Sequence, residues 1–511
     1  MAEAAFTHFE GLLGTSVDRQ HSLDLDFLDT HSEDLSELEA VFTEDEIWEA
    51  IRRLPVGKAP GPDGFTAEFL QKCWGVVKGD FMAAFDKLFT LCGRGFQGLN
   101  QALLILLPKR PDVDALGDYR PISLIHIFAK LVAKALATRL APRMELLVDR
   151  NQCAFIRKRC IHDNFMLVQQ TARFLHREKE PRVMLKLDIA RAFDSVSWGL
   201  RTNFAKCSVS PIACSEAEDA GAAELMECQL APFPVRYLGI PLSIRRLTTA
   251  AFQPLLDRLA DKLPTWRASM MPRAGRLALI RSVLEAIPLH QLMVLSLDKK
   301  ALKQVNKILR GFLWAGRADA NGGHCHVNWA RVCRPLRLGG LGIPDLARTA
   351  ISLRVRWIWR LHTDHLRPWR GLDMHFSKTE LDVFAASTYM VVGNGESALF
   401  WEDRWLDGRS IKVMAPEVYA LVPKRRRKVR IVREALVERT WIPDIAGAPS
   451  ALAMWQYVQL WGRLRDTQLS WDPDRLVWRW TTDGQYSAGS CYDTLFQGQS
   501  SQGLGSSTGA T

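Results

Sequence analysis

The sequence lacks several features that would assign the protein to a well-defined class. Its ten cysteines form no Cys-x-x-Cys pair, so neither a disulfide framework nor a zinc site is indicated, and we expect no bound zinc. No apolar run approaches the ~20 residues that a membrane-spanning helix needs, so we expect no membrane contact. Adjacent aspartates are also missing, since no Asp-Asp dipeptide occurs in the 511 residues. From these absences we expect an intracellular protein, nuclear or cytoplasmic.

Positive charge is what the chain has in excess. The net charge is +11 and the pI is near 9.2, which suits a polyanion such as RNA or DNA, although charge alone does not exclude a merely soluble basic protein. The densest basic run consists of Lys424, Arg425, Arg426, Arg427 and Lys428. Such a run is either a solvated face or a nuclear-import or RNA contact. The composition is globular, and the length suggests two to four domains.

The hydrophobic pattern predicts both helices and strands. Residues 1–42 are acidic and irregular and are expected to form a tether. Thr43 and Glu46 have the spacing of a capping box, so we expect a helix that ends at Pro55. Further elements are predicted as helices at 65–74, 81–92, 127–146 and 165–178, buried strands at 102–107 and 182–189, a turn at 118–124, and long amphipathic helices from 251.

The most informative stretch is Leu187–Asp194. An apolar run ends on Asp188, and a bulky aromatic residue, Phe193, follows five positions later. This pattern resembles the first metal-binding motif of a reverse transcriptase palm. Other segments resemble that family in the same order: Gly57–Gly64, Leu107–Lys109, Asp118–Ser123, Asn151–Asn164, Tyr237–Leu242, Gly339–Ile343 and Trp401–Trp405. Together they resemble a LINE-type (non-LTR) retrotransposon reverse transcriptase, with the nearest match to plant elements.

The resemblance implies roles for individual residues. Asp188 would be the catalytic carboxylate and a metal ligand, together with the carbonyl of Ile189. Lys109 and Arg120 would clamp the incoming triphosphate, Phe193 would sit under the sugar, and Lys206 would lie near the departing pyrophosphate. Nucleic-acid contacts are implied for the basic run at 424–428 and for Lys58, Arg157, Lys158 and Arg159. The residues alone favour a simpler interpretation, in which each cation is an exposed side chain and Phe193 a core ring, whereas the resemblance favours the inherited roles. The family implies Mg²⁺ and an RNA or DNA template-primer.

The resemblance breaks off after Trp198. In the family, a helix, a second motif and a hairpin with adjacent aspartates precede a segment that resembles Gly199–Cys207. Here Trp198 joins Gly199 directly, which indicates an internal deletion or a wrongly spliced gene. Polymerisation uses two divalent ions about 3.5–4 Å apart, and Asp194 fits a helix cap or surface residue better than a replacement ligand. We therefore expect no productive Mg²⁺ binding and a loss of activity of roughly 10⁴-fold or more.

The expected architecture is mixed α+β, an incomplete right-hand polymerase followed by a mainly helical region. Its parts are an acidic tether (1–42), a fingers-like region (43–181), a truncated palm (182–250), a helical thumb-like region (251–375), a linker region with the basic run (376–470), the start of a truncated reverse-transcriptase zinc-binding domain (471–496) and a disordered tail (497–511). The expected function is an inactive RNA-directed DNA polymerase. The alternatives are a non-enzymatic RNA- or DNA-binding remnant and a wrongly spliced fragment of an active enzyme.

Overall fold

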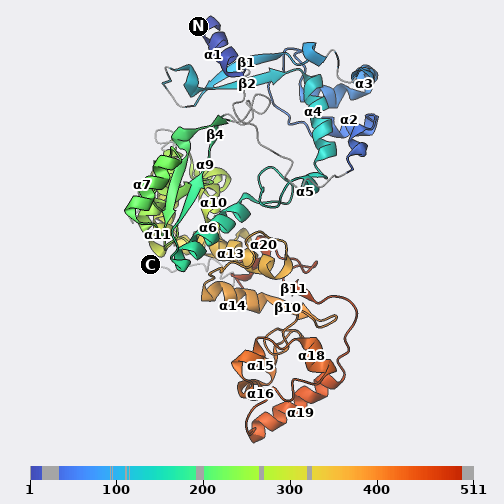
Figure 1. The fold of residues 1–511 in the computed structure, drawn as a ribbon, viewed down its shortest axis with the longest axis vertical. Helices are drawn as coiled ribbons and strands as arrows, with labels where there is room; N and C mark the ends of the chain where they lie inside the picture. Colours follow the sequence, from blue (N-terminus) through green and yellow to red (C-terminus); the bar gives the residue numbers. More distant parts are fainter. Residues whose placement is uncertain are drawn as a thin grey trace, which may run out of the picture. The chain divides into compact units, whose positions relative to one another are not determined.

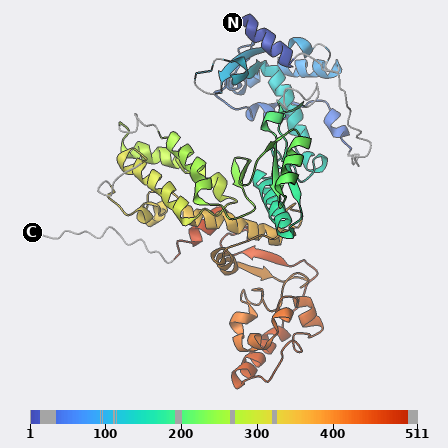
Figure 2. The same ribbon diagram turned by 60° about the vertical axis from the view of Figure 1, so that its left-hand side comes forward.

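The computed structural model describes residues 2–13, 34–91, 94, 96–109, 112–113, 115–190, 201–263, 270–318 and 325–497. Within these ranges the chain has mixed α and β structure and divides into two compact units. Unit 1 comprises Met1–Ile161 and Val183–Ala231, and unit 2 comprises His162–Arg182 and Pro232–Thr511. Figures 1 and 2 show the elements of both units from two directions. The expected tail at 497–511 lies outside the described residues except for Gln497.

Helices supply the core of unit 1. They are α1 (Ala2–Leu13), α2 (Glu44–Arg52), α3 (Ala67–Thr90), α4 (Ile127–Leu140) and α5 (Met144–Leu147). The side chain of Thr43 accepts a hydrogen bond from the N–H of Glu46, which confirms the predicted cap of α2. Ile47 of α2, Phe85 of α3 and Leu131 of α4 are fully buried against one another. The capped, amphipathic α2 is therefore held in place by the two longer helices.

Three helical expectations for unit 1 are wrong in detail. The two helices predicted at 65–74 and 81–92 are the single helix α3, because its buried residues Leu70, Trp74 and Phe85 outweigh the cost of about 1 kcal/mol for each glycine inside it. The helix predicted to reach 146 ends at Leu140, where Pro142 follows and cannot continue the hydrogen-bond ladder. Residues 2–13, expected to be irregular, form α1.

The β1–β2 hairpin of unit 1 is largely exposed. β1 (Ala102–Pro108) pairs antiparallel with β2 (Tyr119–Ile125) in a sheet of two strands. The strand predicted at 102–107 is thus present, but the turn predicted at 118–124 is wrong, since β2 occupies it. Leu103 is 53% exposed and Ile105 is 44% exposed, so the predicted burial is wrong as well. A sheet of two strands has no third layer to cover it.

A second sheet follows the order β3-β6-β7 and contains β3 (Arg182–Lys186), β6 (Ser208–Ile212) and β7 (Gln229–Leu230). β6 and β7 run parallel, and α7 (Glu216–Leu225) connects them. The prediction of a strand covered on both faces is wrong for β3, because Val183 and Leu185 remain 41% and 37% exposed. The apolar run that precedes Asp188 is therefore a partly uncovered strand.

Unit 2 is mainly helical, as the pattern after residue 250 predicts. Its first elements are α6 (Ile161–Glu178), β8 (Val235–Tyr237), β9 (Ile240–Leu242), α8 (Gln253–Asp261), α9 (Arg273–Leu279), the π-helix η6 (Ile280–Leu284), α10 (Ala286–Leu292), α11 (Lys299–Ala315), α12 (Trp329–Val332), α13 (Leu346–Thr363) and α14 (Lys378–Ser387). The predicted amphipathic repeat is confirmed in α8, where Leu255, Leu256 and Leu259 are buried. Among the described residues, no helix has both the length and the apolar composition that crossing a bilayer requires.

A buried carboxylate ties α6 to α13 and the loop after it. Asp163 is fully buried and accepts hydrogen bonds from Nη1 of Arg367 (2.8 Å) and Nε1 of Trp369 (2.9 Å), while Nη1 of Arg360 lies 3.4 Å away. A buried carboxylate is tolerated when charged and polar donors surround it in this way. Asp163 is thus part of the framework of unit 2.

The last part of unit 2 is a helical cluster with its own core. We call the helices α15 (Ile411–Met414), α16 (Pro416–Leu421), α17 (Lys424–Arg427), α18 (Val432–Val437) and α19 (Ala451–Arg465) the C-terminal cluster. Phe400, Trp401, Val432 and Leu460 lie in its core. β10 (Thr388–Val391) and β11 (Arg475–Trp478) enter and leave the cluster as an antiparallel pair, seen in Figure 2 above the orange helices. α20 (Ala488–Thr494) then packs on α13.

Candidate active site and nucleic-acid interface

Asp188 lies in the short connection between β3 and β4 (Ile189–Ala190). Its backbone carbonyl accepts a hydrogen bond from the N–H of Asn203 (2.7 Å), and its own N–H donates to Sγ of Cys207 (3.3 Å). Both partners belong to the segment that follows β5 (Arg201–Thr202). The backbone of Asp188 is therefore fixed by residues that the sequence did not single out, and its carboxylate stays partly exposed.

The carboxylate of Asp188 faces a cation. Nζ of Lys206 lies 3.6 Å from Oδ2 of Asp188, and the two side chains are 69% and 37% exposed. The structure thus brings together two of the residues that the resemblance placed at one site. An exposed pair of this kind contributes about 0–1 kcal/mol, so Lys206 is free to move between partners. Within the described ranges, no group of three or more His, Cys, Asp or Glu side chains is arranged to hold a metal ion.

The two strands that flank residues 191–200 pair with each other directly. Ile189 lies opposite Thr202, and Ala190 lies opposite Arg201, in an antiparallel register. The chain therefore returns next to Asp188 within a dozen residues. Phe193, Asp194 and the junction of Trp198 with Gly199 lie outside the described residues.

Lys109 and Arg120 belong to the β1–β2 hairpin. Nζ of Lys109 donates to the carbonyl of Gly117 (2.6 Å), and the backbone N–H of Lys109 donates to the carbonyl of Asp118 (2.9 Å). Arg120 is exposed and lies opposite Leu107 in the register. Among the described residues, no hydrogen bond or ion pair joins either side chain to Asp188. The structure leaves both cations on an exposed hairpin.

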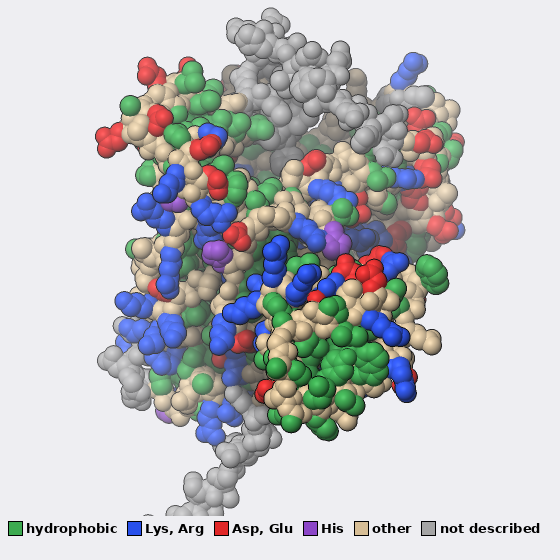
Figure 3. Space-filling view, turned by 60° about the horizontal axis from the view of Figure 1, so that its bottom comes forward, with side chains coloured by type: hydrophobic (Ala, Val, Ile, Leu, Met, Phe, Trp, Pro, Cys, Tyr) green, Lys and Arg blue, Asp and Glu red, His purple; other side chains and the backbone are tan. Residues whose placement is uncertain are grey.

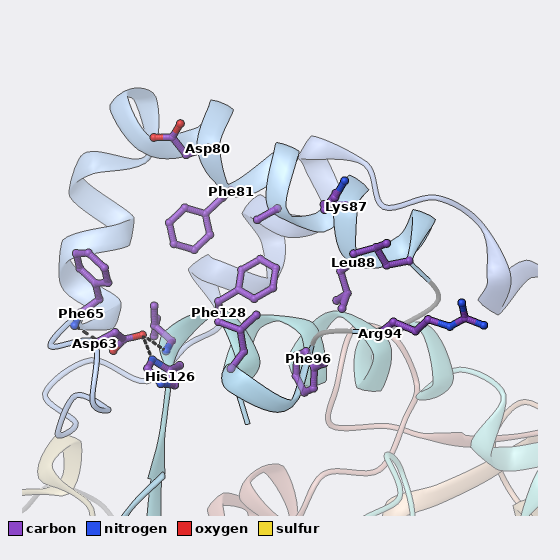
Figure 4. Close-up of a pocket in the computed structure, with 14 residues that line it drawn as sticks. Asp63, Phe65, Asp80, Phe81, Lys87, Leu88, Arg94, Phe96, His126 and Phe128 are labelled. Atoms are coloured by element: carbon purple, nitrogen blue, oxygen red, sulfur yellow. Dashed lines mark hydrogen bonds and ion pairs between the residues drawn. The ribbon is translucent and has the colours of Figure 1, made fainter. Parts of the chain in front are cut away.

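The Gly57–Gly64 segment caps the start of helix α4, a structural role that the sequence did not reveal. Asp63 Oδ2 accepts a hydrogen bond from the N–H of Ile127 at the start of α4 (2.6 Å) and lies 3.5 Å from Nδ1 of His126. A Cβ on Gly61 would come within 2.0 Å of the carbonyl of Ile125, so only glycine fits. Figure 4 shows these contacts at the edge of an apolar cavity of about 490 Å³. Lys58 is exposed on the same segment.

The cations at 157–159 divide into exposed and engaged side chains. Arg157 and Lys158 are exposed, whereas the guanidinium of Arg159 donates to four backbone carbonyls, those of Glu145, Val148, Asp149 and Gln152. Lys158 has a φ of 65°, in the left-handed region that favours glycine. Arg159 therefore holds the loop together, while its two neighbours remain accessible to a polyanion.

The basic run at 424–428 shows the same division. Arg427 donates to the carbonyls of Val422 (2.6 Å) and Ala420 (3.0 Å), and its guanidinium lies 4.0 Å from the ring centroid of Tyr419. The four other cations, Lys424, Arg425, Arg426 and Lys428, are exposed. Figure 3, which turns the lower part of Figure 1 toward the viewer, shows an apolar patch with Lys and Arg as well as Asp and Glu side chains around its edge. Exposed Trp455 and Val458 of α19 contribute apolar surface to the C-terminal cluster.

Comparison with known proteins assigns the central part of the chain. Residues 107–242 match the family described as reverse transcriptase (RNA-dependent DNA polymerase). This part is similar to a reverse transcriptase domain. It includes Lys109, Arg120, Asp188, Ile189 and Lys206, and it ends at the last residue of β9. The matched residues fall partly in unit 1 and partly in unit 2.

Three relatives extend the similarity. An Arabidopsis thaliana protein named as a ribonuclease H protein is 26% identical over 286 residues, which are 50% of this chain and 44% of the relative. The transposon TX1 149 kDa protein of Xenopus laevis is 35% identical over 159 residues, or 31% and 12% of the two chains. The Pol polyprotein of retrotransposable element R1 of Bradysia coprophila is 30% identical over 157 residues, or 30% and 15%. The matched part is less than half the length of each of these relatives.

Sequence reasoning missed several residues around the reverse transcriptase domain. Cys207 and Asn203 position the backbone of Asp188, and their only signal was their place just after the interrupted motif. Arg173, Arg245 and Arg246 line a cavity in unit 2. The adjacent arginines at 245–246 follow shortly after the Tyr237–Leu242 segment, and they are a sequence signal that could have indicated this cavity.

Proposed function

We propose that the chain is the reverse transcriptase region of a non-LTR retrotransposon protein and that it no longer polymerises DNA. Support for the first part comes from the family match at 107–242 and from the similarity to the TX1 and R1 proteins. The plant-like character rests on the order of the sequence segments. Mg²⁺ and an RNA or DNA template-primer are the cofactor and partner that this family uses.

The proposed architecture follows the right-hand arrangement of a polymerase. The fingers-like region (43–181) contains the exposed β1–β2 hairpin with Lys109 and Arg120, and the truncated palm (182–250) contains Asp188. The thumb-like region (251–375) is supported by the continuous run of helices from α8 to α13. Residues 471–496 resemble the start of a reverse-transcriptase zinc-binding domain.

The observation that carries the proposed inactivity is the environment of Asp188. Its one ion pair among the described residues is with Lys206, a cation that would compete with Mg²⁺ for the carboxylate. Two divalent ions about 3.5–4 Å apart need several carboxylate oxygens, since Mg²⁺ prefers oxygen ligands in octahedral geometry. One carboxylate 3.6 Å from an ammonium group does not fit such a centre. The sequence offers no adjacent aspartates to complete it.

Nucleic-acid binding is the activity that we propose survives. Its expected surface consists of exposed cations, namely Lys58, Arg157, Lys158, Lys424, Arg425, Arg426 and Lys428. Contacts between such cations and phosphates release counterions, so the affinity should fall steeply as salt is raised. A purified chain that binds no template-primer at low salt would refute this part of the proposal.

Primer extension on an RNA template tests the proposal. The purified chain should extend no primer with Mg²⁺ or Mn²⁺, while it still binds the template-primer in a salt-sensitive way. The matched variants are Asp188→Ala and Lys206→Ala, which remove the two members of the exposed pair without disturbing a core. Robust synthesis by the unmodified chain, abolished by Asp188→Ala, would refute the inactivity. Sequencing the gene across the Trp198–Gly199 junction separates a true deletion from a splicing error.

A gain-of-function variant sharpens the test. A segment carrying the second motif and the paired aspartates of a related element is inserted between Trp198 and Gly199. Because β4 and β5 already pair on either side of residues 191–200, the insertion should leave β3, β6 and β7 in place. Recovery of extension that depends on Asp188 would show that only the missing carboxylates prevent catalysis.

A further inference from the structure

Unit 2 contains a cavity of about 790 Å³, and its lining includes neither Asp188 nor any cation of the nucleic-acid surface proposed above. Helix α6 contributes Gln169, Arg173 and Phe174, and the segment after β9 contributes Arg245 and Arg246. The start of α11, the middle of α13 and residues 373–377 complete the wall. The volume lies within the range of about 300–1,000 Å³ that is common for ligand pockets.

The cavity has more arginine than its acids can balance. Five arginines line it, and two of them are paired: Nη1 of Arg177 lies 2.7 Å from Asp373, and Nε of Arg354 lies 2.6 Å from Glu380. The remaining acid, Asp298, is occupied as the cap of α11, where it accepts hydrogen bonds from Ala301 and Thr249. Among the described residues, the three other arginines, Arg173, Arg245 and Arg246, form no ion pair.

Two polar side chains in the cavity wall, those of Gln169 and Arg173, form fewer hydrogen bonds than they could. Gln169 is 2% exposed, and its amide nitrogen has no hydrogen-bond partner, which is costly for a buried donor. Arg173 donates a single hydrogen bond, from Nε to the carbonyl of Ser243 (3.3 Å). Burial, and then repulsion from Arg354, lower the pKa of Arg173. An anion in the cavity would relieve both costs, because it would accept from Gln169 and neutralise Arg173.

The wall also offers apolar surface of the kind that nucleobases contact. Phe174 and Phe376 line the cavity beside the arginines, and Phe174 is 42% exposed. Aromatic rings stack on bases of any sequence, while arginine binds phosphate through its planar fork. We propose that this cavity binds a short stretch of single-stranded nucleic acid, with backbone phosphates on Arg173, Arg245 and Arg246 and a base against Phe174. The proposal rests on the nucleic-acid binding inferred above and assigns it a site.

Fluorescence anisotropy of the full chain with a labelled ten-nucleotide oligouridine tests the assignment. The pocket variant is Arg173→Gln/Arg245→Gln/Arg246→Gln. Its affinity should fall at least about 10-fold at low salt, and the slope of log K against log salt should decrease by about 2, since each lost contact with a single strand removes about 0.7. Gln169→Leu should weaken binding several-fold with an unchanged slope, because it removes a neutral donor.

A matched triple variant controls for net charge. Arg337→Gln/Arg433→Gln/Arg463→Gln removes three exposed arginines of the same unit, each paired with an acid outside the cavity. It should bind within about 2-fold of the unmodified chain, as exposed ion pairs contribute little. Circular dichroism and thermal melting confirm that all variants fold. Equal binding by the pocket variant and the unmodified chain would overturn the cavity assignment alone.

Two further outcomes separate this assignment from its alternatives. If the unmodified chain binds no oligonucleotide, the proposed nucleic-acid binding fails together with the site. Uridine monophosphate is the second probe, since a free nucleotide shares its chemistry with one unit of a strand. Competition by this probe only at concentrations far above those of the oligonucleotide supports the strand. Equal affinity for the two probes would overturn the strand and assign the cavity to a free nucleotide.

Discussion

Large apolar side chains are exposed in the β1–β2 hairpin but buried in the C-terminal cluster. Leu104 and Ile105 of β1 are 43% and 44% exposed, whereas Phe400, Trp401 and Val432 of the cluster are completely buried. Both segments are rich in large apolar residues, so composition does not explain the difference. The cluster has several helices to enclose its rings, while the hairpin has one partner strand. Burial is therefore decided by the number of packing layers that the neighbouring elements supply.

The largest test of this comparison removes a ring from the well-packed side. Trp401→Ala should lower the free energy of unfolding of the C-terminal cluster by about 3–5 kcal/mol, because a fully buried ring leaves a cavity behind. It also removes the hydrogen bond from Nε1 to Asp444 (3.2 Å). Hydrogen exchange of peptides within residues 398–464 under urea measures the change for the cluster alone.

The control for Trp401→Ala is Leu104→Ala in the hairpin. Since Leu104 is already 43% exposed, its truncation should change local stability by no more than about 0.5 kcal/mol. Comparable losses at both positions would contradict the difference in packing. They would mean that another layer covers the hairpin in solution.

The next test concerns the carboxylate beneath Trp401. Asp444 is 3% exposed and accepts two hydrogen bonds of 2.8 Å from Arg430, from Nε and Nη2. Burial by itself would raise the pKa of Asp444, but the hydrogen bonds from Arg430 and Trp401 outweigh burial and hold the pKa below 3.8. A group with a lowered pKa stabilises the fold above its unfolded pKa and loses that contribution as the pH falls through its folded pKa.

Asp444→Asn should therefore destabilise the cluster by about 3 kcal/mol near neutral pH, since it leaves Arg430 without its charged partner. The difference from the unmodified chain should stay constant down to about pH 4 and shrink below it, where the native carboxylate also becomes protonated. Urea midpoints across this range measure the effect. A difference that grows on acidification would contradict the sign. Glu434→Gln is the control, because its side chain is 45% exposed and pairs with the same arginine (3.0 Å).

Substitutions in β1 should affect stability less, but they should have a measurable effect on solubility. Leu103→Thr/Ile105→Thr keeps side chains that favour strands and removes exposed apolar surface from a strand of a two-stranded sheet. The free energy of unfolding should change by no more than about 0.5 kcal/mol, and the soluble fraction after expression should rise. Ile411→Thr in the buried core of the cluster is the matched control and should lower both quantities. A loss of solubility from the β1 variant would show that its apolar face is covered.

The sequence predicted what depends on local pattern. The Thr43 cap, the amphipathic repeat of α8 and the existence of β1 follow from spacing within one segment, and each is present. The β2 strand, the uncovered faces and the continuity of α3 depend on what lies alongside in space. Gly75 and Gly79, for example, have open space around them in α3, so nothing local stops the helix. Residues distant in sequence therefore determine the β2 strand, the uncovered strand faces and the continuity of α3.

The candidate site divides in the same way. The type of residue at Asp188 and the absence of adjacent aspartates were readable from the sequence, and so was the proximity of Lys206 through the family resemblance. The engagement of Arg159 by four carbonyls and the capping role of Asp63 were not, because both use backbone groups from other segments. A list of cations taken from the sequence therefore overstates the nucleic-acid surface. Cations whose side chains bind protein groups must first be distinguished from those that remain accessible.

The smallest expected effect lies in the loop around Lys158, whose backbone adopts the left-handed conformation that favours glycine. Lys158 has a φ of 65° and is exposed, so its side chain contributes strain and no packing. Lys158→Gly relieves the strain but adds freedom to the unfolded chain, and the net gain should be about 0.5 kcal/mol. Lys158→Ala is the control and should give no gain, because it keeps a Cβ in the left-handed region. Both variants remove the charge of Lys158, so a fall in oligonucleotide affinity shared by the two would assign Lys158 to the binding surface. A melting temperature raised in both variants would show that charge repulsion, and not backbone strain, destabilises the fold at this position.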